Sequence, residues 1–515
     1  MTKPLTSLNH AARREFLRRA GAMSMLGAAS PLALNLAAMG EASAQAAADY
    51  RALVCIFLFG GNDTYNTVLA TDAASWANYQ SVRSQAPDPI ALLATGVSAD
   101  LAAAAGSPAR LGGALALSPI NAQGRSFAMH PLLTGARDLF AAGRLAIVPN
   151  VGPLLRPTTK TDYRNSAFPK PPKLFSHNDQ QSTWQAFAAE GARTGWGGRM
   201  GDLLAAGNSN AIFTSISASG TAVWLAGQSV LQYQVSSNGP IRIGGSGATL
   251  FGSNTGVAQL HAVMRSARSA DVLTLDHAAV VDRSIDAEGL VSAALPAAGV
   301  APHGTPLASG NYSASTDPLL RYNNPLTGAT ASNSLAQQLQ IVARMIAART
   351  TLGARRQVFF VSLGGFDTHD GQNRSHADLM ARLSHAFTYF DGVLGAMALR
   401  DQVTTFTMSD FGRTFTSNGD GTDHGWGAHH FVMGGAVRGR DLYGAFPQYG
   451  VSDGRGDFTS PNQIGNGSLL PETSVDQYGA TLGRWFGLND SQLLEVFPNL
   501  AQFDAGRRDL GFMLA

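Results

Sequence analysis

This chain of 515 residues has one cysteine, few charged side chains and no strongly apolar run of membrane-spanning length. A lone cysteine excludes an intrachain disulfide, and the place of Cys55 inside an apolar run is typical of a small buried side chain rather than a nucleophile. Charged residues make up 14% of the chain and hydrophobic residues 45%, which is a globular composition. The length fits about two to three domains, or a single core with insertions.

The first 44 residues are predicted to be a twin-arginine signal peptide. Arg13-Arg14 open the string RREFLR, residues 20–39 are mildly apolar, and residues 42–44 (ASA) form a small-residue cleavage site. Proline, asparagine and several small residues make the apolar stretch too weak for a stable membrane anchor. We therefore expect the twin-arginine export machinery as a partner, and a folded protein in the periplasm or secreted from the cell.

The formal net charge of +2 belongs to this predicted signal. Removing residues 1–44 takes away five basic and two acidic side chains and leaves 32 basic and 33 acidic ones. A mature chain that is close to neutral lacks the basic surface that nucleic acids or anionic membranes require. Neither is expected as a partner.

Three predicted strands, at residues 53–59, 358–363 and 403–408, are each followed by an aspartate. These are Asp63, Asp367 and Asp410. Because the carboxyl ends of parallel strands meet at one edge of a sheet, the three carboxylates are predicted to converge there, joined by His369 and His424. The alternative for the segment after Asp410 is a polar hairpin in which the aspartate caps a turn.

The rest of the chain predicts an α/β fold. A helix at residues 334–350 leads into the second of these strands, and a helix at 375–399 connects it to the third, which is the pattern of a parallel βαβ unit. Alternating apolar and polar residues at 211–255 predict a small inserted antiparallel sheet. Residues 91–125 are expected to be a surface excursion, and the proline-rich segment 153–173 an extended loop.

Ser176 stands before a predicted helix at residues 180–190. A serine there is most often an N-cap, but it also fits an exposed nucleophile at a helix terminus that favours anions. Arg413 is expected either to pair with a substrate oxyanion or to form a surface salt bridge. Three more histidines rank second as site residues, and two of them are adjacent on a predicted strand, so that at most one faces the site. They are His177, His429 and His430.

Six strings carry a family resemblance: FLFGGNDTYN, FAMHPLL, FSHNDQQSTWQ, GGFDTHDGQ, MSDFGRTFTSNGDGTDHGWGAHHFV and SVDQYGATLGRWFG. In this order they resemble the domain of unknown function 1501 family, whose members are bacterial and commonly exported by the twin-arginine route. The family is grouped with the alkaline-phosphatase-like proteins, which include sulfatases and cofactor-independent phosphoglycerate mutases. The resemblance spans about residues 50–505.

The resemblance implies an alkaline-phosphatase-like three-layer αβα core with a mostly parallel sheet and a small β-rich subdomain. The domain would cover residues 50–505, with insertions at about 91–125 and 211–330. The implied metal ligands are Asp63, Asp367, His369, Asp410 and His424. Ser176 is the implied nucleophile, with Thr64 as the runner-up.

Two departures from the superfamily pattern leave the number of ions open at one or two. The usual Asp-His pair is Asp410-Phe411 here, and the spacing from Asp367 to His369 is short, so that His376 is an alternative ligand. Mixed aspartate and histidine ligands suit zinc or manganese. The predicted function is an exported metal-dependent hydrolase of small or polymeric phosphate or sulfate esters. The alternatives are a non-catalytic envelope binding or scaffold protein that retains the fold and, third, a phosphomutase.

Overall fold

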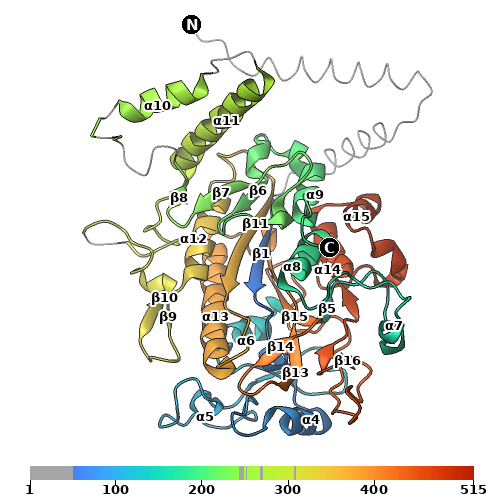
Figure 1. Ribbon diagram of the computed structural model, residues 1–515. Coiled ribbons are helices and arrows are strands. Elements are labelled where there is room, and N and C mark those ends of the chain that lie inside the picture. The colour runs from blue at the N-terminus through green and yellow to red at the C-terminus, as the bar shows by residue number, and fades with distance from the viewer. Residues whose placement is uncertain are drawn as a thin grey trace, which may run out of the picture.

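The computed structural model describes residues 50–242, 249–250, 252–253, 255–266, 271–306 and 309–514. The predicted signal peptide lies outside these residues. A nine-stranded sheet forms the centre, in the order β18-β5-β15-β12-β1-β11-β6-β7-β8 (Figure 1). Its strands are β1 (Arg51–Phe59), β5 (Leu145–Gly152), β6 (Ser215–Ser217), β7 (Tyr233–Ser236), β8 (Gly239–Pro240), β11 (Arg356–Gly364), β12 (Val403–Ser409), β15 (Ala428–Met433) and β18 (Thr473–Ser474).

The sheet is mostly parallel. β1 lies at its centre and pairs in parallel with β11 on one side and β12 on the other. β15 runs antiparallel between β12 and β5, and β8 runs antiparallel at the far edge. The prediction of an α/β fold is confirmed, and so is the parallel direction of β11 and β12, although β1 lies between these two strands.

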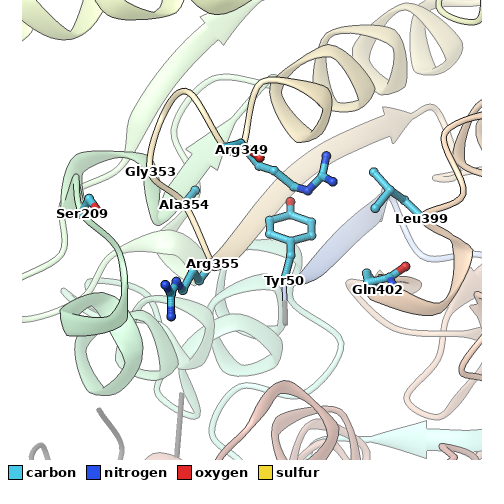
Figure 2. A pocket seen from close by; sticks show the side chains of 9 residues that line it. Tyr50, Ser209, Arg349, Gly353, Ala354, Arg355, Leu399 and Gln402 are labelled. Atoms are coloured by element: carbon cyan, nitrogen blue, oxygen red, sulfur yellow. The ribbon is translucent and has the colours of Figure 1, made fainter. Parts of the chain in front are cut away.

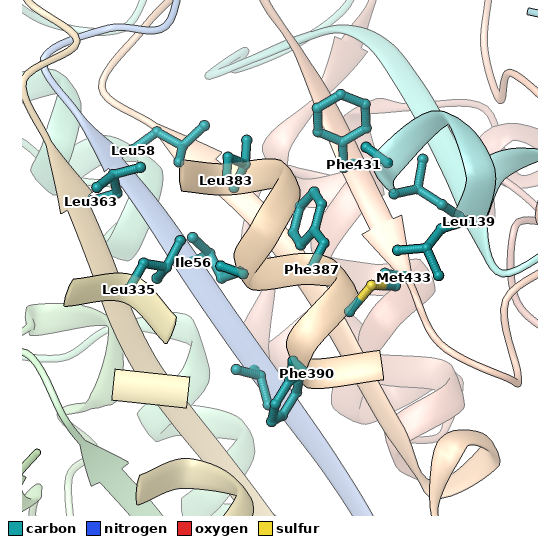
Figure 3. Close-up of a cluster of buried hydrophobic side chains, with 14 of the residues drawn as sticks. Ile56, Leu58, Leu139, Leu335, Leu363, Leu383, Phe387, Phe390, Phe431 and Met433 are labelled. Carbon is teal, nitrogen blue, oxygen red and sulfur yellow. The ribbon is translucent and has the colours of Figure 1, made fainter. Parts of the chain in front are cut away.

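Helices cover both faces of the sheet because β1 is apolar on both sides. Ile56 and Leu58 face α12, α13 and α6, as Figure 3 shows for the cluster around Phe387. Cys55 and Phe57 face the opposite way, toward α9 and α14. The helices of the two layers are α6 (Thr134–Ala141), α8 (His177–Ala186), α9 (Trp196–Leu204), α12 (Ser334–Ala347), α13 (Gln372–Ala396), α14 (Val475–Phe486) and α15 (Asp490–Val496). Strands with both faces covered are typical of parallel sheets.

Small antiparallel sheets and further helices lie beside this core. The strands are β2 (Val68–Ala70), β3 (Leu115–Leu117), β4 (Phe127–Met129), β9 (Arg321–Asn323), β10 (Thr330–Ser332), β13 (Arg413–Ser417), β14 (Thr422–His424), β16 (Gln463–Ile464) and β17 (Ser468–Leu469). The helices include α3 (Thr64–Thr67), α4 (Ala73–Arg83), α5 (Pro108–Leu111), α10 (Gly256–Arg265) and α11 (Val272–Ala294). Within the described ranges, no helix has the length and apolar character needed to cross a membrane.

Two predictions of local structure are wrong. In the described residues of the segment 211–255 there is no separate antiparallel sheet, because β6 and β7 extend the main sheet in parallel beyond β11, and β8 pairs with β7 in antiparallel direction. Alternation indicates a half-buried strand but does not specify its pairing partner. The segment 153–173 contains the short helix α7 (Lys160–Arg164), which begins at a capping box between Thr159 and Asp162.

Candidate metal centre

Three strand ends lie level at one edge of the sheet. In the register of β1, Phe59 is opposite Gly364 of β11, and Leu58 is opposite Ser409 of β12. The chain then turns at Gly60, whose φ is +115° and where a Cβ would lie 2.3 Å from the backbone nitrogen of Asp367. Only glycine allows this close approach at a positive φ. The turns after β11 and β12 are therefore packed against the end of β1.

His177, Asp367 and His424 form a cluster at this edge. Their potential ligand atoms all lie within 4.8 Å of one another. The Nε2 atom of His177 is 3.3 Å from one oxygen of Asp367, and the Nε2 atom of His424 is 3.3 Å from the other. His177 comes from the first turn of α8 and His424 from the end of β14, so three distant segments supply the three side chains.

The outer nitrogen of each imidazole is fixed by an acceptor. The Nδ1 atom of His177 donates to Asp410 Oδ2 at 2.6 Å, and the Nδ1 atom of His424 donates to the carbonyl oxygen of Phe175 at 2.7 Å. The hydrogen bond to Asp410 raises the pKa of His177, whereas burial lowers the pKa of His424. Acceptors behind a histidine fix its tautomer and orientation, which is the arrangement found around metal ligands. Both Nε2 atoms therefore face Asp367.

Arg413 holds Asp367 in place. Its Nη1 atom donates to Asp367 Oδ1 at 2.6 Å and to the carbonyl oxygen of Gly60 at 3.2 Å, and its Nε atom donates to Thr422 Oγ1 at 3.2 Å. Partial burial alone would raise the pKa of Asp367, but the hydrogen bond and charge of Arg413 lower it below the ordinary value. Asp367 is thus a carboxylate with a fixed orientation.

His369 lies on the outer side of the cluster. Its Nε2 atom is 3.0 Å from His424 Nε2 and 3.1 Å from Asp367 Oδ1, and its Nδ1 atom is 3.3 Å from Asp423 Oδ1. A carboxylate beside Nδ1 favours a proton on that nitrogen, which leaves a lone pair on Nε2. Two imidazole lone pairs would then face each other at 3.0 Å unless a proton or a cation lies between them.

The donor atoms of the cluster fit a divalent cation. The Nε2 atom of His177 is buried and makes no hydrogen bond, even though Asp367 lies 3.3 Å away. Asp367 and its three neighbouring imidazoles offer the mixed oxygen and nitrogen donors that zinc and manganese accept. Asp410 contacts His177 from behind, so in this arrangement it orients a ligand instead of reaching the centre.

The structure does not bring Asp63 into the cluster. Both of its oxygens accept from Arg83, at 2.6 and 3.0 Å, and Gln372 donates to it at 2.6 Å. Asp63 and Arg83 are fully buried. Because four donors, including the backbone nitrogen of Tyr65, occupy this carboxylate, it balances a buried guanidinium below the site.

The two hydroxyls predicted as nucleophiles lie in different surroundings. Ser176 is the N-cap of α8 as predicted, but its hydroxyl donates to the carboxylate of Asp179 at 2.9 Å and makes no bond to the helix backbone. Ser176 is partly exposed and stands beside His177. The hydroxyl of Thr64 is fully buried and has no hydrogen-bond partner. Of the two, only Ser176 is open to solvent.

The remaining candidate histidines are core residues. His376 is buried and lies 3.1 Å from Asn62 Oδ1, and burial lowers its pKa to about 4. His429 packs against Phe446, whereas His430 packs against Trp184 on the opposite face of β15, as expected for neighbours on a strand. None of the three belongs to the cluster at the strand ends.

The sequence analysis ranked His177 only second among the candidate site residues, and it did not identify Gln181. Gln181 lies one helical turn after His177 and donates to the same Asp410 oxygen at 2.8 Å. The one available signal was the position of His177 immediately after Ser176 at a helix start, since its partner Asp410 is 233 residues away. Contacts over that separation are not visible in local patterns.

A separate surface pocket lies at the opposite end of the sheet, where β1 and β11 begin. It has a volume of about 470 Å³ and is lined by Tyr50, Arg349 and Arg355, among others. Figure 2 shows the side chains of the two arginines pointing in different directions, with Arg349 over the Tyr50 ring at 5.3 Å. The pocket has no residue in common with the histidine and aspartate cluster.

The chain matches a known protein family over most of its length. A family model with the description "Protein of unknown function (DUF1501)" matches residues 50–497. No curated protein matches the chain.

Proposed function

The chain belongs to the DUF1501 family, and from the geometry at its strand ends we propose that it is an exported metal-dependent hydrolase of phosphate or sulfate esters. The observation that supports this is the orientation of His177 and His424. Both imidazoles are held from behind, by Asp410 and by the Phe175 carbonyl, so that their Nε2 atoms face Asp367. Acceptors behind the histidines in this way are typical of metal centres, where they fix the tautomer and orientation of each ligand.

His177, Asp367 and His424 would hold the cation, with His369 as the outer ligand. A bound zinc or manganese ion would neutralise charge on the transferred group and help to activate an oxygen nucleophile. Arg413 keeps the carboxylate of Asp367 turned toward the two imidazoles. The centre is open on one side, because 43% of the Asp367 side chain and 40% of the His369 side chain are exposed.

Ser176 is the proposed nucleophile of the chain itself. Ser176 precedes His177 in the chain and is partly exposed. Its hydroxyl donates a hydrogen bond to Asp179, which orients the hydroxyl group. In the attack on an ester, Ser176 Oγ would bond to phosphorus or sulfur, its proton would pass to Asp179, and the bond to the ester oxygen would break. The leaving oxygen would take a proton from water and depart as the alcohol, and a second water would then cleave the enzyme ester and restore the serine hydroxyl.

Elemental analysis and ester turnover test the proposal together. The exported protein is expected to contain stoichiometric zinc or manganese and to hydrolyse aryl sulfates or phosphates. Ser176→Ala is expected to retain the metal and lose turnover. If the variant keeps both, Ser176 acts only at the helix terminus and an activated water is the nucleophile. A protein without metal under these conditions would contradict the proposal.

The second candidate is a non-catalytic binding protein of the cell envelope. This candidate is favoured by the hydrogen bonds of two polar groups near the centre. Arg413 donates to Asp367 and Ser176 donates to Asp179, so both groups already have a partner within the protein. Stoichiometric metal without turnover of any ester would support this candidate.

A further inference from the structure

The charge around the mouth of the metal centre restricts the group that can bind there. The open side of the cluster is the side of Asp367 and His369, since the side chains of His177 and His424 are only 28% and 25% exposed. A ligand that enters from this more exposed side passes His369. The residues on this side decide which charge is tolerated.

Three carboxylates belong to the chain segments on this side. Asp423 lies beside His369, with 3.3 Å between Oδ1 and Nδ1, and it is 48% exposed. Asp370 follows His369 in the chain and is exposed. Asp420 accepts a hydrogen bond from the backbone nitrogen of Gly371 at 2.8 Å, so it lies at the same turn. In the part of the chain that the structure describes, none of the three has an arginine or lysine within ion-pair distance.

Two cationic side chains near the centre, Arg413 and Lys173, each have a carboxylate partner. Arg413 is fully buried, and its guanidinium donates to Asp367, to Gly60 and to Thr422. Lys173 lies close to α8, but its Nζ atom is 3.5 Å from Asp179. Enzymes that bind a dianionic phosphoryl group usually supply a guanidinium or ammonium directly to its oxygens. Among the described residues that contact the cluster, no such group is left over.

We propose, on the basis of the hydrolase function above, that this centre takes a group with one negative charge, as in a sulfate monoester or a phosphodiester, and disfavours the dianion of a phosphate monoester. A divalent cation and Arg413 carry three positive charges, and Asp367, Asp410 and Asp423 carry three negative ones. Asp370 and Asp420 add two further negative charges on the open side, so they oppose each negative charge of a bound group, and a dianion is opposed about twice as strongly as a monoanion.

The test uses binding as well as turnover. Benzenesulfonate and phenylphosphonate have similar shapes, and at alkaline pH they carry one and two negative charges. Calorimetry with the metal-loaded protein is expected to show tighter binding of benzenesulfonate. In parallel, the ratio of kcat/KM for bis(p-nitrophenyl) phosphate to that for p-nitrophenyl phosphate is measured at the same pH.

Variants of Asp423 and Asp370 test whether the carboxylates on the open side cause the preference for a monoanion. Asp423→Asn is expected to improve phenylphosphonate binding about threefold more than benzenesulfonate binding, because a second unit charge is no longer opposed at close range. Asp370→Asn, at an exposed position, gives the same test if the first variant folds poorly. Asp490→Asn is the matched control, since this exposed aspartate lies on α15 beside Arg484, away from the centre. It is expected to leave the ratio unchanged.

The outcomes separate this inference from the proposed function. Preference for phenylphosphonate in the wild type, or no selective change in both mouth variants, overturns the inference even if esters are hydrolysed. Binding of neither anion also overturns it. Preference for benzenesulfonate without turnover of any ester retains the inference about charge and overturns the hydrolase.

Discussion

His177 and Asp410 are joined by a 2.6 Å hydrogen bond between Nδ1 and Oδ2, although 233 residues separate them in the chain. This contact connects the start of α8 to the end of β12. It turns the other nitrogen of His177 toward Asp367, which lies 3.3 Å away. The proposed metal centre depends on this orientation more than on any local motif.

Asp410→Asn is therefore expected to weaken metal binding by about 10–100-fold, the usual effect of losing a carboxylate behind a histidine ligand. Metal titration with a competing chelator measures this change. Gln181→Ala, which removes the other donor to Asp410, is the control and should have a smaller effect. Equal affinities of the wild type and Asp410→Asn would show that His177 is not a ligand.

Asp63→Ala is expected to lower the free energy of unfolding by about 3–5 kcal/mol and to leave metal content unchanged, because it strands the buried guanidinium of Arg83. Chemical denaturation of the metal-free protein and elemental analysis give the two readouts. The double variant Asp63→Leu/Arg83→Met removes both charges and should recover much of the stability. If the folded Asp63→Ala variant lost its metal, Asp63 would be a metal ligand after all.

Thr64→Val is expected to be nearly neutral or stabilising by up to about 1 kcal/mol, since the buried hydroxyl has no hydrogen-bond partner to lose. Ester hydrolysis should be unaffected. The same denaturation and turnover assays apply, with Ser176→Ala beside it. A variant that folds normally but is inactive would make Thr64 the nucleophile.

Asp476 is expected to make stability fall as pH rises toward neutrality. Burial raises the pKa of this carboxyl to about 7, against about 3.9 in the unfolded chain. The folded state therefore binds the proton more tightly than the unfolded chain. The contribution of this proton to the free energy of unfolding is complete below about pH 4 and is lost as pH rises through about 7. Unfolding free energies of wild type and Asp476→Asn at several pH values test this. Their difference should change by at most about 1.4 kcal/mol per pH unit, and a constant difference would exclude the shift.

Replacing Arg13 and Arg14 with lysine is expected to retain the precursor in the cytoplasm, because the twin-arginine receptor recognises this pair. Cell fractionation measures the outcome. Normal accumulation of the double variant in the periplasm would show that residues 1–44 are not a twin-arginine signal.

The sequence by itself determined the main elements of this fold. The apolar runs that became β1, β11 and β12 are continuous and short, and the helices predicted at residues 334–350 and 375–399 are α12 and α13. Asp367 and His369 were identifiable because they follow the end of a predicted strand, where parallel strands place their loops together. His424 was identifiable because it ends the polar loop between two predicted strands. Local patterns suffice for such elements because the spacing of apolar residues along the chain indicates whether a segment is a helix or a strand and which of its faces is buried.

Only the tertiary structure decided which polar side chains meet. Asp63 follows the same strand and glycine pattern as Asp367, yet Arg83 from α4 occupies it, while His177 from α8 enters the cluster. The inserted segment likewise joined the main sheet, because β6 pairs with the edge of β11 and β7 pairs with β6. Pairing of charges, imidazoles and strand edges is settled by long-range packing, since the competing partners are equally compatible with the local sequence.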